Sequence, residues 1–283
     1  MATWLPPMTN QLQGKSRPLS ILAVFAHPDD EGFGCGGTLA ALVAGGHRVS
    51  LVCATNGDVG EISDPALATP ETLPSVRQCE LRAAMDLTGI QDVRFLNYRD
   101  SGMPGWEDND HPRSLFRAPA EKVILQVEGA IRELKPDLVI THDPTGGYGH
   151  PDHVTISQRT QAAVERCRDG GRPALYYVCF PRSFFQRMWN KMMELGLRPP
   201  FSADDTEALG TPDDEVTTIL DVGRHVAIKK ESLELHRTQI ERDGPFSKLP
   251  PDFMEEIMSS EFFQLVPFGG EETRDLLAEL SGK

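Results

Sequence analysis

The feature that most constrains the fold is an almost uninterrupted apolar run from Leu19 to Ala26. A short run of this kind, rich in branched aliphatic residues, is typical of a strand in a parallel sheet that is covered on both faces. The proline after His27 ends strand pairing, and the glycines at 32–37 predict a turn before a helix over Thr38–Ala44. A second strand over Val49–Ala54 completes a strand–helix–strand unit, which indicates the start of a doubly wound sheet.

Helices and strands continue to alternate along the rest of the chain. Up to residue 180, the expected elements are helices over Val76–Leu87, Ala120–Leu134 and Thr155–Cys167 and strands over Val93–Asn97, Leu138–Thr141 and Ala174–Phe180. Beyond Pro181 the pattern weakens, with helices expected over Arg182–Leu195, Val226–Glu241 and Glu271–Leu280 and a strand over Thr217–Val222. The alternation predicts an α/β fold: a Rossmann-like, mostly parallel sheet with helices on both faces and a smaller C-terminal elaboration.

The charge and composition of the chain narrow the choice of partners. A net charge of −14 disfavours a nucleic-acid backbone and an anionic membrane surface as partners. No apolar stretch approaches the roughly 18–20 residues that span a bilayer, and the N-terminal residues lack the apolar core of a signal peptide. The five cysteines are dispersed and form no CxxC pair, which indicates reduced thiols. We therefore expect a cytoplasmic protein with no membrane insertion and no nucleic-acid partner.

Polar, turn-rich segments follow four of the predicted strands. They are 27–31 after the first strand, Asp58–Glu61 after the second, Tyr98–Gly102 after the third and His142–His153 after the fourth. In open α/β sheets, ligands bind at the carboxyl ends of the strands. These segments are therefore expected to meet at one edge of the sheet and to form a site there.

Two of these segments carry the residue types of a metal site. Zinc takes imidazole nitrogen and carboxylate oxygen in tetrahedral geometry, and a catalytic zinc keeps one position open for water. His27 and Asp30 are three residues apart at a turn, so both can point at one ion, and Asp29 between them is placed to act as a general base. His150 and His153 are three residues apart at a predicted helix start, so one can be a ligand while the other faces a substrate carbonyl.

In these segments the sequence resembles the PIG-L/LmbE-like deacetylases. The matching stretches are Ala26–Glu31, Thr55–Asp58, Arg77 with Glu80 and Ala84, and Gly147–His153. Tyr98–Met103 is similar to the branch that acts on N-acetylglucosaminyl-inositol or on mycothiol conjugates, and Lys230–Gln239 looks like the family's C-terminal helix. The resemblance implies a metal-dependent hydrolase that removes the acetyl group from an N-acetylglucosamine-type amino-sugar conjugate. A homo-oligomer is a further expectation, by analogy with the family alone.

The resemblance also implies a set of ligands and a base. The ligands of Zn²⁺ would be His27, Asp30 and His153, and Asp29 would be the base. A site with two histidines, one aspartate and open positions also suits ferrous iron, so Fe²⁺ is the alternative metal.

Further roles follow from the same resemblance. His150 would stabilise the oxyanion, Asp152 would orient that histidine, and Tyr148 would move over the site and help the intermediate. The positions that match contacts to substrate hydroxyls or to a phosphate are Arg77, Asp100 and Asp58.

The chain is accordingly divided into three parts. Residues 1–18 are polar and contain prolines, which predicts a flexible N-terminal tail. Residues 19–180 are expected to form the α/β catalytic core. Residues 181–283 are expected to form the C-terminal elaboration, which packs on the core and contributes to the substrate pocket.

Three other functions are compatible with parts of this pattern. An amidase of mycothiol-type S-conjugates would use the same metal and base but would need room for a bulky S-linked group. A catalytically silent sugar-binding protein gains no support, because the residues of the proposed machinery are all present. A nucleotide-binding module is disfavoured, because the glycines at 32–37 do not fit the G-x-G-x-x-G spacing and the acidic segment before them would repel a pyrophosphate.

Overall fold

The computed structural model of the protein describes residues 17–167, 171–199, 209–240, 246–268 and 274–280. Apart from its last two residues, the tail expected over 1–18 lies outside the described residues. The strands are β1 Ser20–Phe25, β2 Arg48–Thr55, β3 Asp92–Tyr98, β4 Leu138–His142, β5 Ala174–Cys179, β6 Thr218–Asp221 and β7 Ser260–Leu265. The helices are α1 Asp30–Ala44, α2 Leu73–Thr88, α3 Ala120–Leu134, α4 Gly146–Gly149, α5 Pro151–Arg166, α6 Arg182–Glu194, α8 Val226–Glu234, α9 Pro251–Met258 and α10 Leu276–Leu280.

The strands form one sheet in the order β3-β2-β1-β4-β5-β7-β6. The first five strands in this order are parallel, and β7 runs antiparallel to both β5 and β6. The direction of winding reverses between β1 and β4, and such a switch point is where open α/β sheets bind ligands. The expected α/β fold with a mostly parallel sheet is confirmed.

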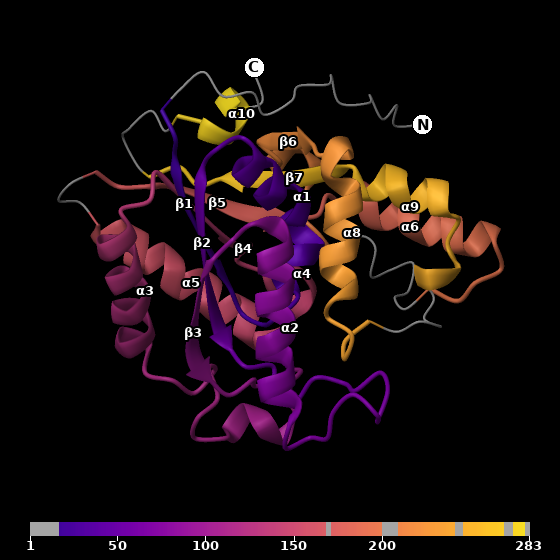
Figure 1. Ribbon diagram of the computed structural model, residues 1–283, viewed down its shortest axis with the longest axis horizontal. Coiled ribbons are helices and arrows are strands. Elements are labelled where there is room, and N and C mark those ends of the chain that lie inside the picture. The colour runs from indigo at the N-terminus through magenta and orange to yellow at the C-terminus, as the bar shows by residue number, and fades with distance from the viewer. Residues whose placement is uncertain (1–16, 168–170, 200–208, 241–245, 269–273, 281–283) are drawn as a thin grey trace.

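Helices cover both faces of the sheet (Figure 1): α3 and α5 lie on one side, and α1, α2 and α8 lie on the other. The central strand β1 is buried on both faces, as its apolar run predicts. Ile21 and Phe25 pack into the layer of α1 and α2, while Leu22 and Val24 pack into the layer of α3 and α5. Burying an aliphatic side chain in this way contributes about 1.5–3 kcal/mol.

The structure corrects the turn that the glycines at 32–37 predict. These residues belong to α1, which begins at Asp30 and has a kink at Cys35. The glycines allow neighbouring elements to approach the helix closely: a Cβ atom at Gly34 would lie 2.4 Å from Val178 Cγ1, and one at Gly37 would lie 2.6 Å from Val222 Cγ2. Close packing therefore favours glycine here even though glycine weakens an isolated helix.

The region after residue 180 differs from the prediction in three further ways. The helix expected over Val226–Glu241 ends at Glu234, and α9 and β7 were not expected. The final helix, expected over Glu271–Leu280, begins only at Leu276, because the described residues Arg274 and Asp275 are not helical; 271–273 lie outside the described residues. Figure 1 shows α6 and α9 side by side, and their apolar side chains form a small separate core. Over the described residues, no helix combines the length and the apolar character that crossing a membrane requires.

A buried ion pair joins α8 and β7 to α1. Lys229 Nζ lies 2.7 Å from Glu261 Oε1, and both side chains are almost fully buried. The same carboxylate accepts hydrogen bonds from the backbone N–H groups of Gly37 at 2.9 Å and Thr38 at 2.7 Å, just beyond the kink in α1. Glu261 therefore satisfies the amides that the kink leaves without helical partners.

We expect Glu261→Gln to lower the free energy of unfolding by about 3–5 kcal/mol, because it leaves the buried Lys229 ammonium without its counter-charge. Urea unfolding followed by circular dichroism measures the change. Arg117→Ala is the control, because the Arg117–Asp110 pair is largely exposed and its loss should have little effect. Equal stabilities of the two variants would contradict the prediction.

Candidate active site

The polar segments meet at the carboxyl edge of the sheet, as predicted. His27 follows β1, and His150 and His153 stand at the start of α5, after β4. His27 Nε2 lies 3.5 Å from Asp100 Oδ1, and the Asp100 N–H donates to Asp58 Oδ2 at 3.2 Å. The site therefore lies at the switch point between β1 and β4 and extends toward β2 and β3.

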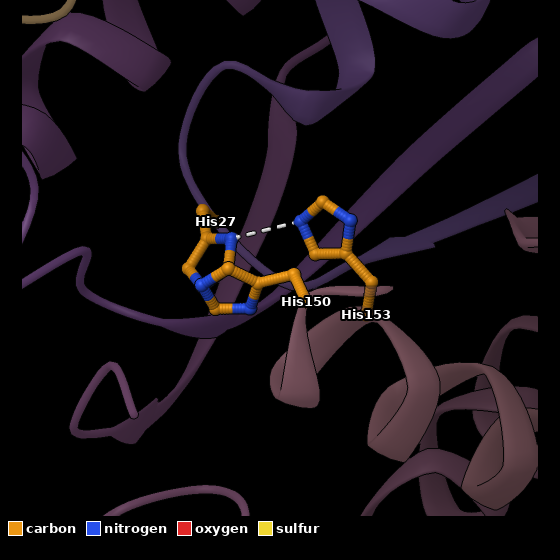
Figure 2. A group of neighbouring side chains, drawn as sticks. All are labelled: His27, His150 and His153. Carbon is orange, nitrogen blue, oxygen red and sulfur yellow. Dashed lines mark hydrogen bonds between the residues drawn. The ribbon is translucent and has the colours of Figure 1, made fainter. Parts of the chain in front are cut away.

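The three predicted metal ligands form a compact triangle of donor atoms. His27 Nδ1 lies 3.1 Å from His153 Nε2 and 3.4 Å from Asp30 Oδ2, and His153 Nε2 lies 3.2 Å from Asp30 Oδ1. Figure 2 shows the rings of His27, His150 and His153 converging, with the His27–His153 contact as a dashed line. Donors about 2.0–2.1 Å from a tetrahedral zinc are about 3.3 Å from one another. The three side chains therefore lie as close together as one such ion requires, with one Asp30 oxygen near each histidine.

The hydrogen-bond partners of the two rings indicate that a cation belongs between them. His27 Nε2 lies 3.2 Å from Asp152 Oδ2, and His153 Nδ1 lies 3.2 Å from the carbonyl oxygen of Gly146. Both partners are acceptors, so each ring carries its hydrogen on that side. In the neutral rings, the lone pairs of His27 Nδ1 and His153 Nε2 then point toward the same place, which is the arrangement that a bound cation requires. Metal-binding histidines are oriented by acceptors in this manner, and the His/Asp cluster accordingly fits a divalent metal ion.

Asp152 has a different partner from the expected one. Its carboxylate contacts His27 and also accepts the backbone N–H of Ser101 at 2.8 Å, whereas only its backbone N–H reaches His150, donating to Nδ1 at 3.2 Å. The expectation that this carboxylate orients His150 is therefore not met. The sequence separation of the two residues gave no indication of which ring the carboxylate faces.

His150 is held as a hydrogen-bond donor. Because Nδ1 accepts the Asp152 N–H, the hydrogen of a neutral ring sits on Nε2, which lies 4.0 Å from Asp100 Oδ1. Burial, followed by the proximity of His27 and His153, lowers the pKa of His150 to about 3. The ring is thus neutral and presents an N–H toward the site.

Another histidine near the triangle is His142, to which the sequence assigned no role. Its ring stacks on that of His153 with centroids 4.0 Å apart, and its Nε2 lies 3.3 Å from Asp30 Oδ2. The backbone N–H of Ala26 donates to the same nitrogen at 3.1 Å. Its position at the end of β4, at the edge where ligands bind, was the signal that could have identified it.

Asp29 is held in an unusual backbone conformation beside the triangle, with φ 107° and ψ −27°. Its carboxylate lies 3.3 Å from Arg77 Nη2. Burial raises the pKa of the Asp29 carboxyl to about 6, against the opposing effect of Arg77.

The residues predicted to contact substrate lie in different environments. Arg77 is buried and donates to the carbonyl oxygens of Pro28 at 2.6 Å and Gly57 at 3.1 Å, so its predicted substrate contact stays a prediction. Asp58 lines an open cavity of about 470 Å³. Tyr148 is largely exposed, and its ring centroid lies 5.3 Å from that of His153.

Comparison with known proteins identifies the family. The family model described as "PIG-L: GlcNAc-PI de-N-acetylase" matches residues 22–164. This chain belongs to the PIG-L family of deacetylases. The resemblance stated from the sequence motifs is thereby confirmed.

Individual relatives of the PIG-L family cover almost the whole chain. The chain is similar to 1D-myo-inositol 2-acetamido-2-deoxy-alpha-D-glucopyranoside deacetylases from Geodermatophilus obscurus (37% identical, 87% of this chain and 91% of that protein) and Acidothermus cellulolyticus (37%, 92% and 94%). Among solved structures, N,N'-diacetylchitobiose deacetylase from Pyrococcus horikoshii aligns with a TM-score of 0.60 at 24% identity, over 89% of this chain and 85% of that one. The structural match supports the fold alone.

We expect Asp30→Ala and His153→Ala to lose stoichiometric Zn²⁺ binding, because each removes one donor of the triangle. Asp152→Ala removes only the acceptor behind His27 and should weaken Zn²⁺ binding by about 10–100-fold. Competition with a chromophoric chelator measures these affinities. His47→Ala, at the opposite edge of the sheet, is the control and should bind as the wild type does. Unchanged affinity in Asp30→Ala would exclude the triangle as the site.

Proposed function

We propose that this PIG-L family hydrolase removes the acetyl group from an N-acetylglucosamine-type amino-sugar conjugate, giving acetate and a free amine. The observation that carries the proposal is the triangle of His27, Asp30 and His153 donor atoms with Asp29 beside it. Relatives that align over nine-tenths of their length are named as deacetylases of an inositol glycoside of N-acetylglucosamine. An inositol-type polyol is therefore the aglycone that we favour.

The ligands proposed for the metal are His27, Asp30 and His153, with Zn²⁺ as the metal and Fe²⁺ as the alternative. Bound there, the ion would act as a Lewis acid that lowers the pKa of water and polarises the acetamide carbonyl. Asp152 and the Gly146 carbonyl keep the hydrogens of the two rings on the far side from the ion.

Asp29 is proposed to transfer a proton from the attacking water to the leaving nitrogen. It accepts a proton from the attacking water as the water oxygen bonds to the acetamide carbon. It then returns this proton to the nitrogen as the C–N bond breaks, so acetate and the free amine leave together. Arg77, 3.3 Å from the Asp29 carboxylate, fixes its direction.

His150 is proposed to stabilise the negative charge that develops on the carbonyl oxygen. Its Nε2–H can donate a hydrogen bond from a neutral ring, so this role does not require a protonated imidazole. Removing a donor of this kind typically lowers the rate by about 10²–10³-fold. Tyr148, exposed beside the His153 ring, is proposed to move over the bound substrate.

The polyol is proposed to lie toward Asp58 and Asp100, whose carboxylates can accept hydrogen bonds from hydroxyl groups. Asp58 links Asp100 to the open cavity. Its carboxylate accepts a hydrogen bond from the Asp100 N–H, and its side chain also lines the cavity of about 470 Å³. Arg77 is a third proposed contact. The cavity does not discriminate between a polyol and the S-linked group of a mycothiol conjugate, so the amidase remains the second candidate and is tested below. The cytoplasmic location and a homo-oligomeric state stay predictions.

The proposed function is tested by measuring amine release from N-acetylglucosaminyl-inositol, from N-acetylglucosamine and from a mycothiol S-conjugate. We expect N-acetylglucosaminyl-inositol to be cleaved with a higher kcat/KM than N-acetylglucosamine, because it offers hydroxyls beyond the sugar. Chelation should abolish release and Zn²⁺ or Fe²⁺ should restore it. Preference for the S-conjugate would support the amidase, and no release from any substrate would contradict the proposed function.

We expect Asp29→Ala to lower the rate of amine release by about 10²–10⁴-fold, because general bases contribute rate factors of this size. Its Zn²⁺ content should stay that of the wild type, since Asp29 is not among the proposed ligands. Asp86→Ala, on the exposed side of α2, is the control for loss of an aspartate. Wild-type turnover by Asp29→Ala would show that another group takes the proton.

A further inference from the structure

The segment after α8 reaches the loop that carries Asp29. His236 is fully buried, and its Nε2 lies 2.8 Å from Glu31 Oε1, a residue 205 positions earlier in the chain. Glu31 is also fully buried, and its other oxygen accepts the backbone N–H of Asp29 at 3.0 Å. Two successive hydrogen bonds therefore connect His236 to the backbone of Asp29.

The second of these hydrogen bonds, from the Asp29 N–H to Glu31, holds the peptide group between Pro28 and Asp29 in place. The N–H of Asp29 and the carbonyl of Pro28 belong to the same peptide group. Glu31 binds its N–H, and Arg77 Nη2 binds its carbonyl oxygen at 2.6 Å. The φ of 107° at Asp29 lies in the left-handed region, which a residue other than glycine keeps only when its surroundings enforce it. Hydrogen bonds to both the N–H and the carbonyl oxygen hold this peptide group in place. They thereby fix the φ of Asp29 and the direction of its side chain.

We propose that His236 is a positioning residue for Asp29, acting through Glu31; this inference rests on the proposed role of Asp29 as the base. His236 donates from Nε2 to the Glu31 carboxylate and so keeps the other oxygen of Glu31 on the Asp29 N–H. Without this donor the carboxylate is free to rotate, the peptide group relaxes, and the Asp29 carboxylate turns away from the attacking water.

In the described part of the chain, the His236 ring makes one hydrogen bond, from Nε2 to Glu31. Within the part of the chain that the structure describes, its Nδ1 has no hydrogen-bond partner. Glutamine offers an amide N–H at a similar reach from the backbone, whereas the asparagine side chain is one carbon shorter. His236→Gln should therefore preserve the contact to Glu31, and His236→Asn should lose it while remaining polar.

The segment after α8 makes a second contact with the core, through Thr238, and a variant of this contact can serve as a matched control. The backbone N–H and the hydroxyl of Thr238 donate to the Glu80 carboxylate on α2, at 2.9 and 2.7 Å. Thr238 is as deeply buried as His236, but its bonds do not lead to Asp29. Thr238→Val removes the hydroxyl bond, so it weakens the docking of the segment without touching Glu31.

The test compares kcat, KM, Zn²⁺ content and thermal unfolding for His236→Ala, His236→Asn, His236→Gln and Thr238→Val. We expect His236→Ala and His236→Asn to lower kcat by about 10–100-fold with KM and Zn²⁺ content unchanged, because a small misplacement of a reacting group has effects of this size. His236→Gln should recover most of kcat. Thr238→Val should lower the melting temperature but keep kcat. If His236→Ala does not fold, the contrast between His236→Asn and His236→Gln decides the question.

Any of three results of this comparison would overturn the inference: wild-type kcat in His236→Asn, a kcat in His236→Gln as low as in His236→Asn, or a loss of kcat in Thr238→Val equal to that in the His236 variants. Failure of the proposed function is seen separately, as a wild-type protein that releases no amine. An Asp29→Ala variant that stays active would also overturn the inference, because His236 would then have no base to position.

Discussion

The structure depends most on two imidazole nitrogens that face each other 3.1 Å apart, on His27 and His153. Each ring is fixed by an acceptor on its far side, so both lone pairs point inward. A cation bound between the neutral rings would contact both lone pairs. Stability and metal affinity are therefore expected to be coupled in the manner of other metal sites.

The sheet topology is what brings these rings together. His27 and His153 are 126 positions apart, but β1 and β4 are neighbours, and both end at the edge where the winding reverses. His27 follows one strand, and His153 lies in the first turn of α5, which follows the other. The same edge receives Asp100 after β3. A parallel sheet thus aligns the ends of distant segments, and residues far apart in the sequence meet at one edge.

Strands β1 to β6 could be predicted because their signals are local, and the meeting of His27 with His153 could be predicted from the expected parallel sheet. Apolar runs such as Leu19–Ala26 identify strands, and the spacing of His27 and Asp30 places both residues at one point. The partners behind the ligands could not be predicted. Whether Asp152 faces His27 or His150 depends on how α5 is rotated against β1, which no spacing within the motif encodes. The glycines of α1 predict a turn from sequence alone, because the close approach of other elements that they allow is visible only in the packed structure.

The C-terminal region is joined to the core at both halves of α1, and this bears on the boundary expected near residue 181. Beyond the kink, the helix amides bond to Glu261, which Lys229 neutralises. At the start of the helix, Glu31 bonds to His236. Both contacts bury charged or polar groups whose loss is costly, so the core without this region would leave them unpaired. Lys229, Glu261 and His236 therefore complete α1 and the loop before it, while the division of the chain at residue 181 stays a prediction.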